Sequence, residues 1–140
     1  MRELIVLIGM FICQINYGQN ILGKWKTIDD LNGKESGIVE IFESRGKIYG
    51  KIVEIFDHDK KNLKCEKCDG EDKNKPILGL TIIKGLLKNN DVYEGGKIVD
   101  PKNGKSYHCK IAFEGKDKLI VRGFIGISLF GRSQTWIRHK

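Results

Sequence analysis

The sequence lacks the short local motifs that mark common enzyme classes. It has no Gly-x-Ser-x-Gly, no His-Glu-x-x-His and no phosphate-binding loop, and its three histidines are scattered. Ser128, in the most apolar segment, has no evident base beside it in sequence. The acid pairs Asp29-Asp30 and Asp69/Asp72 lie in predicted turns, where carboxylates usually face water. We therefore predict a protein that is not an enzyme and needs no cofactor.

The chain also lacks the features of a nucleic-acid-binding protein. Its 25 lysines and arginines exceed its 18 acids and give a net charge of +7, but they are spread along the whole length. No basic helix and no zinc-finger spacing occurs, so nucleic acid is not an expected partner. The simplest interpretation is a solvated basic surface. The alternative is a weak attraction to anionic lipid or polysaccharide of the cell envelope, which salt would screen.

No apolar run is long enough to cross a bilayer. The longest, Leu4 to Ile15, has 12 residues, whereas a spanning helix needs about 20. A positive N-terminal end before it and the small Gly18 after it are typical of an export signal. We predict a signal peptide over residues 1–18 and one domain over 19–140, in the periplasm or secreted. A first strand or a buried helix is the alternative for the apolar run.

Cysteine is scarce once the signal peptide is removed, because only Cys65, Cys68 and Cys109 remain. In an oxidising envelope we expect a Cys65–Cys68 disulfide. A redox Cys-x-x-Cys is less favoured, because no helical pattern follows Cys65 to lower a thiol pKa. A zinc site would add Cys109 and either His58 or His108, but the spacing is loose. We predict no metal site, and we expect Cys109 to be a small buried apolar residue.

Alternation of apolar and polar residues with a period of two dominates from Leu22 onward, and turn signals recur about every ten residues. Tyr107, Cys109, Ile111 and Phe113 show it most clearly. Asp100 to Gly104 has the composition of a tight hairpin turn, and Gly95-Gly96 indicates a bulge. We predict about eight short strands, over residues 23–27, 38–43, 47–56, 77–83, 93–99, 107–113, 119–124 and 133–139.

Two segments depart from this pattern. Asp57 to Pro76 holds six lysines, six acids and the Cys-x-x-Cys pair, so we expect a long charged loop held by its cysteines or by a function. Lys84 is followed by residues that allow one turn of helix.

The two tryptophans lie in the first and last predicted strands. This placement favours an all-β, single antiparallel eight-stranded barrel, in which the first strand meets the last and no edge is left to pair with other chains. A two-sheet sandwich is the alternative. The C-terminal segment from Val121 to Arg138 is the most apolar part after the predicted signal, and its Phe124–Gly131 stretch is expected to be a plug or a wide turn.

The motifs resemble those of a known family. Asp100-Pro101…Gly104-Lys105…Tyr107, followed by Val121-Arg122-Gly123-Phe124…Gly126…Leu129-Phe130-Gly131-Arg132…Trp136…Arg138, is similar to the exported bacterial proteins of domain-of-unknown-function family 2147 (DUF2147). The resemblance implies a lipocalin-like, calycin-type barrel outside the cytoplasm, with a lipid-like or other apolar ligand. Gly23-Lys24-Trp25 also resembles the lipocalin opening motif, whose Trp packs under an Arg; Arg122 or Arg138 would supply that Arg here.

The expected function is therefore a secreted protein that binds a small apolar or lipid-like ligand without catalysis. Arg122 would meet an acidic headgroup, and aromatic side chains would cover the tail. A packed, dry core is the alternative interior. The alternative function is an envelope interaction module with a solid barrel, acting through an apolar Phe124–Phe130 surface as a homodimer or with another protein. The predicted ligand-binding residues are Trp25, Tyr49 (or its neighbour Ile48), Tyr107, Phe113, Arg122 and Trp136.

Overall fold

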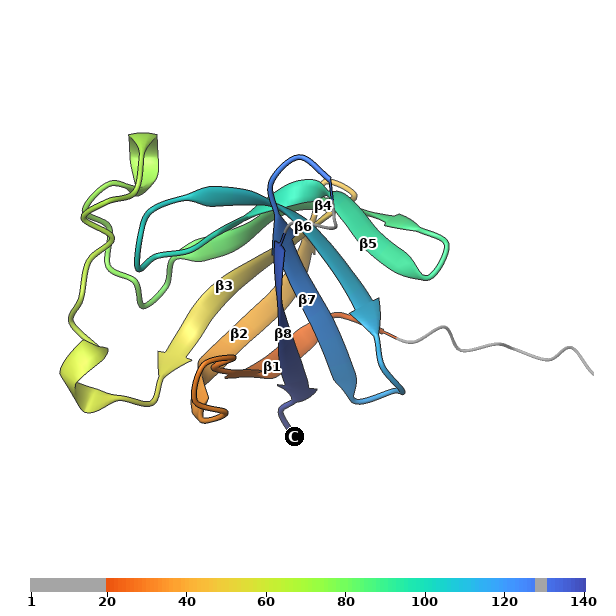
Figure 1. Cartoon of the computed structure of the whole chain (residues 1–140), viewed down its shortest axis with the longest axis horizontal. Helices are drawn as coiled ribbons and strands as arrows, with labels where there is room; N and C mark the ends of the chain where they lie inside the picture. The colour runs from red at the N-terminus through yellow and green to blue at the C-terminus, as the bar shows by residue number, and fades with distance from the viewer. Residues whose placement is uncertain (1–19, 128–130) are drawn as a thin grey trace, which may run out of the picture.

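The computed structural model describes residues 20–127 and 131–140, and the predicted signal peptide lies outside them. Eight antiparallel strands follow one another around a closed barrel, and the last pairs with the first (Figure 1). The predicted all-β, eight-stranded barrel is confirmed, and the sandwich alternative is wrong. The strands are β1 (Gly23–Ile28), β2 (Glu35–Ser44), β3 (Lys47–Ile55), β4 (Thr81–Asn89), β5 (Val92–Val99), β6 (Ser106–Phe113), β7 (Lys118–Phe124) and β8 (Gly131–Arg138).

Closure of the barrel depends on the register between β1 and β8. In this pairing Trp25 lies opposite Arg138, and Thr27 lies opposite Trp136. Both indoles point into the barrel, where Trp25 is 0% and Trp136 1% exposed. The two ends of the described chain therefore lie side by side, as the positions of the tryptophans predicted.

Trp25 closes one end of the barrel. Its indole N–H donates a hydrogen bond of 2.9 Å to the Ile21 carbonyl. The Arg138 guanidinium lies 4.3 Å from the centre of the indole ring, and its Nε donates to Asp117 Oδ1 at 3.1 Å. Phe113 meets the same indole edge-on, with ring centres 6.1 Å apart. Arg138 therefore fills the Trp-covering position for which the sequence left two candidates.

The barrel interior is filled in this closed half. Ile41, Leu86, Ile111 and Leu119 are each at most 1% exposed and pack in one apolar cluster with Trp25. These residues alternate with neighbours that are more exposed, which is the period-two pattern of a barrel wall.

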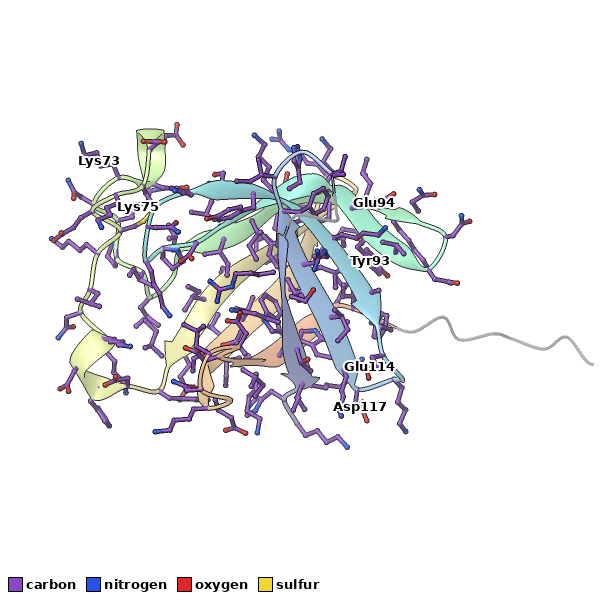
Figure 2. All side chains as sticks on the ribbon, in the orientation of Figure 1. Lys73, Lys75, Tyr93, Glu94, Glu114 and Asp117 are labelled. Carbon is purple, nitrogen blue, oxygen red and sulfur yellow. A yellow bond between two sulfur atoms is a disulfide. The ribbon has the colours of Figure 1, made fainter. Side chains whose placement is uncertain are left out.

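The charged loop between β3 and β4 is pinned by its disulfide. It contains two short 3-10 helices, η1 (His58–Lys60) and η2 (Gly70–Asp72), and Lys73 and Lys75 project from it into solvent (Figure 2). The predicted Cys65–Cys68 disulfide is present, and both sulfur-bearing residues are buried. It packs beneath the β5–β6 turn, where Cys65 Sγ lies 3.6 Å from the Pro101 carbonyl oxygen. No helix among the described residues has the length and apolar character needed to cross a membrane.

Two predicted boundaries are wrong around β4. The strand begins at Thr81 rather than Ile77, because Gly79 has a φ of +92° and the Leu80 N–H bonds back to the Ile77 carbonyl in a turn. No helical turn follows Lys84. The strand continues through Gly85, whose φ of +73° lets the chain bulge without leaving the sheet.

Replacing Trp25 by alanine should lower the free energy of unfolding by about 3–5 kcal/mol, because it empties the closed end of the barrel. Equilibrium urea denaturation measures this loss. The control is Leu31→Ala, whose side chain is 79% exposed, and which should change stability by no more than about 0.5 kcal/mol. A loss below about 1 kcal/mol for Trp25→Ala would contradict its role as the closing residue.

Gly104→Ala and Gly33→Ala separate backbone strain from steric overlap. The two glycines have nearly equal φ values, +71° and +70°, so each alanine should cost about 1–2 kcal/mol in strain. A Cβ on Gly104 would also lie 1.8 Å from the Lys67 carbonyl oxygen, whereas a Cβ on Gly33 meets nothing within 4 Å. Gly104→Ala should therefore lose about 1–3 kcal/mol more in the same denaturation assay. Equal losses of stability in the two variants would show that the disulfide loop is not in close contact with the turn at Gly104.

Candidate ligand-binding cavity

The open half of the barrel encloses a cavity of about 410 Å³. Six strands each contribute at least one apolar residue to its lining, because their side chains alternate between the inside and the outside of the barrel. Its inner wall is formed by Val39 of β2, Ile52 of β3, Ile82 of β4, Ile98 of β5, Val121 of β7 and Trp136 of β8. The dry, fully packed interior that the sequence left open is therefore wrong for this half.

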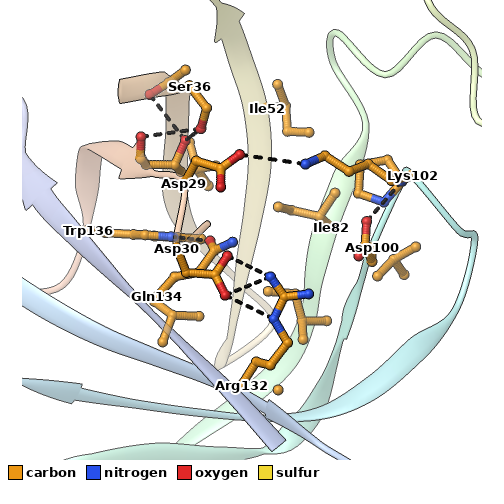
Figure 3. A pocket seen from close by; sticks show the side chains of 18 of the residues that line it. Asp29, Asp30, Ser36, Ile52, Ile82, Asp100, Lys102, Arg132, Gln134 and Trp136 are labelled. Atoms are coloured by element: carbon orange, nitrogen blue, oxygen red, sulfur yellow. Dashed lines mark hydrogen bonds and ion pairs between the residues drawn. The ribbon is translucent and has the colours of Figure 1, made fainter. Parts of the chain in front are cut away.

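A ring of polar side chains surrounds the mouth, as Figure 3 shows. The residues come from the β1–β2 and β5–β6 turns, from the starts of β2 and β8 and from the end of β3, because these segments lie at the same end of the barrel. The polar and charged members of the rim are Asp29, Asp30, Ser36, Glu54, Asp100, Lys102, Arg132 and Gln134.

Arg132 and Asp30 form a bidentate ion pair across the mouth. Arg132 Nε donates to Asp30 Oδ2 at 2.9 Å, and Nη2 donates to Oδ1 at 2.7 Å and to Oδ2 at 2.6 Å. These hydrogen bonds from Arg132 hold the pKa of the Asp30 carboxyl below its ordinary value, and Asp30 in turn raises the pKa of Arg132. The pair fastens the β1–β2 turn to β8, because planar two-point geometry fixes both partners.

A second, looser pair joins the β1–β2 and β5–β6 turns. Lys102 Nζ lies 3.7 Å from Asp29 Oδ2. The Leu31 backbone N–H donates to Asp29 at 2.8 Å; together with the charge of Lys102 it lowers the pKa of the Asp29 carboxyl. Asp29 and Asp30 are therefore both ionised at neutral pH. Asp100 accepts the Lys102 backbone N–H at 2.9 Å and so shapes its turn.

Among the described residues, three aromatic residues line the cavity. They are Tyr107, Phe124 and Trp136. The Trp136 indole N–H donates to Gln134 Oε1 at 3.1 Å, so its polar edge is satisfied within the wall. The Asn103 amide donates to the Tyr107 hydroxyl at 3.3 Å, at the β5–β6 turn. Both hydrogen bonds fix the ring orientation and leave carbon surface toward the interior.

The structure brings only two of the six predicted ligand-binding residues to the cavity, Tyr107 and Trp136. Trp25 and Phe113 point inward but pack against each other at the closed end.

Tyr49 and Arg122 do not line the cavity, which corrects the sequence prediction that placed them there. Tyr49 stacks on Phe42 with ring centres 5.8 Å apart, and its neighbour Ile48 takes the inward position. Arg122 follows inward Val121 and therefore faces outward, where it donates to Ser133 Oγ at 3.0 Å. In both cases the alternation is right and the assigned face is off by one residue.

The sequence did not predict the Asp30–Arg132 ion pair at the mouth, and it did not predict most of the aliphatic residues of the cavity wall. Asp30 and Arg132 are 102 positions apart, so no local pattern connects them. Ile52, Ile82 and Ile98 follow the period-two pattern and were available from it. The prediction favoured aromatic residues over these aliphatic ones.

The three cysteines in the described part of the chain offer no reactive thiol. Cys65 and Cys68 are joined, and burial raises the pKa of the Cys109 thiol to about 12, so Cys109 stays protonated. In residues 20–127 and 131–140, no three His, Cys, Asp or Glu side chains come together in a way that could hold a metal ion. The disulfide uses two of the side chains, Cys65 and Cys68, that the zinc alternative would need as ligands.

Comparison with solved structures finds a similar barrel. The protein HP1028 from the human pathogen Helicobacter pylori, described as belonging to the lipocalin family, superimposes with a TM-score of 0.75 at 26% sequence identity. The alignment covers 86% of this chain and 84% of HP1028. No curated protein matches the chain in sequence.

The sequence also matches a family model directly. The model described as "Uncharacterized protein conserved in bacteria (DUF2147)" aligns with residues 23–138, which run from the start of β1 to the end of β8. The match therefore includes every strand of the barrel, both tryptophans and the Arg138 that covers Trp25. On this evidence the chain belongs to the DUF2147 family of bacterial proteins.

Proposed function

We propose that this protein binds one small, mainly apolar or lipid-like molecule in its barrel and does not change it chemically. The observation that supports this best is the cavity of about 410 Å³, with an apolar wall inside and a polar rim at the mouth. Ligand sites of proteins commonly combine an apolar interior with a few polar groups that orient the ligand. The lipocalin-like fold of HP1028 is consistent with this use of the barrel.

The size of the cavity limits the ligand. Ligand pockets commonly measure about 300–1,000 Å³, and this cavity lies near the lower bound. A single alkyl chain or a small ring system fits this volume better than a two-chain lipid. Each methylene group moved from water to the apolar wall contributes about 0.8 kcal/mol, so one chain gives useful affinity.

Tyr107 and Trp136 are the aromatic residues proposed to contact the ligand, with Ile52, Ile82 and Val121 around its tail. Trp25 and Phe113 are proposed to form the floor below it. We place this binding in the periplasm or outside the cell, because the sequence over residues 1–18 predicts export. A weak contact of surface lysines with anionic envelope material is part of this proposal.

Filling the cavity should weaken ligand binding. Ile52→Trp adds volume to the wall and should weaken binding of the neutral fluorescent probe N-phenyl-1-naphthylamine at least about tenfold, or about 1.4 kcal/mol. The matched control is Lys51→Trp, on the same strand, whose side chain faces the outer Phe42 ring. It should bind the probe like the wild type. Fluorescence titration checks both variants, and equal affinity in all three proteins would contradict binding in the cavity.

A second candidate function is a protein–protein contact through the mouth. Leu31, Ile125 and Ile127 are 79%, 65% and 60% exposed, and exposed apolar patches mark interaction sites. Ser128, Leu129 and Phe130 of the predicted Phe124–Phe130 surface lie outside the described residues. The solid barrel of this alternative does not agree with the cavity, but a homodimer would not require one.

Light scattering after size-exclusion chromatography tests this candidate. If the surface forms a homodimer, the wild type should elute as a dimer, and the double variant Ile125→Ser/Ile127→Ser should elute as a monomer, because each serine removes apolar area. Leu87→Ser is the control, since Leu87 is 49% exposed near the β4–β5 turn at the opposite end. A monomeric wild type at high concentration would rule out the homodimer.

A further inference from the structure

The mouth of the cavity is acidic, although the protein as a whole is basic. Among residues 20–127 and 131–140, four carboxylates and two cations line it, a net charge of −2, whereas the chain carries +7. A concave site with low-dielectric walls focuses such a local charge, so a ligand entering it experiences the rim more strongly than the distant lysines. The charged residues are Asp29, Asp30, Glu54, Asp100, Lys102 and Arg132.

Both cations of the rim are already matched by carboxylates. Arg132 holds Asp30 with two nitrogen atoms at 2.6–2.9 Å, and Lys102 Nζ lies 3.7 Å from Asp29. Within the described part of the chain, Asp100 and Glu54 form no ion pair. The excess negative charge of the rim therefore comes from these two residues.

An anionic headgroup would gain little binding free energy from the charged residues of the rim. To reach Arg132 it would have to displace Asp30 from a bidentate pair and leave that carboxylate without its cation. It would also approach the negative charges of Asp100 and Glu54, which form no ion pair with another described residue. A cationic headgroup can approach Asp100 and Glu54 without breaking an existing ion pair.

The aromatic residues that line the cavity also favour a cationic headgroup over an anionic one. Tyr107, Phe124 and Trp136 line the cavity beneath the rim. The faces of aromatic rings attract ammonium groups and do not attract carboxylates.

We propose that the cavity selects amphiphiles with a cationic head, such as an alkylammonium or a quaternary ammonium compound, over those with an anionic head. The alkyl part lies against the aliphatic wall, and the nitrogen lies among the rim carboxylates. This inference rests on the proposed binding function. It replaces the acidic headgroup that the sequence predicted with a cationic one.

Three ligands with the same chain test the headgroup alone. Dodecylamine, dodecanol and dodecanoate are titrated against N-phenyl-1-naphthylamine bound to the full chain, at neutral pH and low ionic strength. Dodecylamine should displace the probe at about one tenth of the concentration that dodecanoate needs, with dodecanol between them. Added salt should narrow this difference, because the rim is open to solvent.

Variants of the rim locate the effect. Glu54→Gln/Asp100→Asn removes the two rim carboxylates that form no ion pair, and the amide introduced at position 100 keeps an oxygen for the Lys102 N–H. It should reduce the preference for dodecylamine several-fold and leave dodecanol unchanged. Asp30→Asn frees Arg132 and should strengthen dodecanoate binding. The control Glu40→Gln/Glu114→Gln changes the total charge equally, away from the mouth, since Glu40 lies opposite Lys24 and Lys51 on the barrel wall and Glu114 follows β6 at the closed end (Figure 2).

The outcomes separate the two proposals. Equal or stronger displacement by dodecanoate overturns the headgroup preference and leaves ligand binding intact. A preference that falls equally in the control variant overturns the role of the rim, because the total charge would then explain it. Failure of the probe and of all three ligands to bind overturns both the proposed function and this inference.

Discussion

The pairing of β1 with β8 is the constraint on which the rest of the structure depends. It places Trp25 directly opposite Arg138, so one register brings together the residue that closes the barrel and the guanidinium that covers it. The covering Arg138 is itself held by Asp117 from the β6–β7 turn. Without this pairing β1 and β8 would be free edges, and the interior would have no boundary.

Closure at one end leaves the other end hollow. The Trp25 and Phe113 rings fill the closed half, whereas the open half is lined mainly by aliphatic side chains of the strands. These side chains do not span the interior of an eight-stranded barrel, which is just wide enough to hold a small ligand. The Arg132–Asp30 pair and the turn packed on the disulfide then fix the mouth above the cavity. A fixed mouth is useful for selection, because its charges keep their positions when a ligand enters.

The sequence predicted the barrel because its signals are local. Period-two alternation and turn residues identify strands within a few positions, and the two tryptophans indicated which strands meet. It could not place the start of β4, because Ile77 and Leu80 are as apolar as a strand and only the turn at Gly79 shows that they precede it.

The functional site was less predictable, because it depends on the face of the strand that each side chain takes and on contacts between residues far apart in the sequence. A shift of one residue along a strand moves a side chain to the opposite face, and this is how Tyr49 and Arg122 were assigned inward. The Asp30–Arg132 pair depends on barrel closure, so its partners can be matched only once the register of β1 and β8 is known.

Methyl-resolved NMR during titration with N-phenyl-1-naphthylamine tests the central claim most directly, because isoleucines occupy both halves of the interior and the outer surface. The account predicts shifts for the methyl groups of Ile52, Ile82 and Ile98 around the cavity, with little change for Ile41 and Ile111 in the packed half. Shifts confined to Ile127, which is 60% exposed and does not line the cavity, would show that the ligand binds outside the barrel and would contradict binding in the cavity.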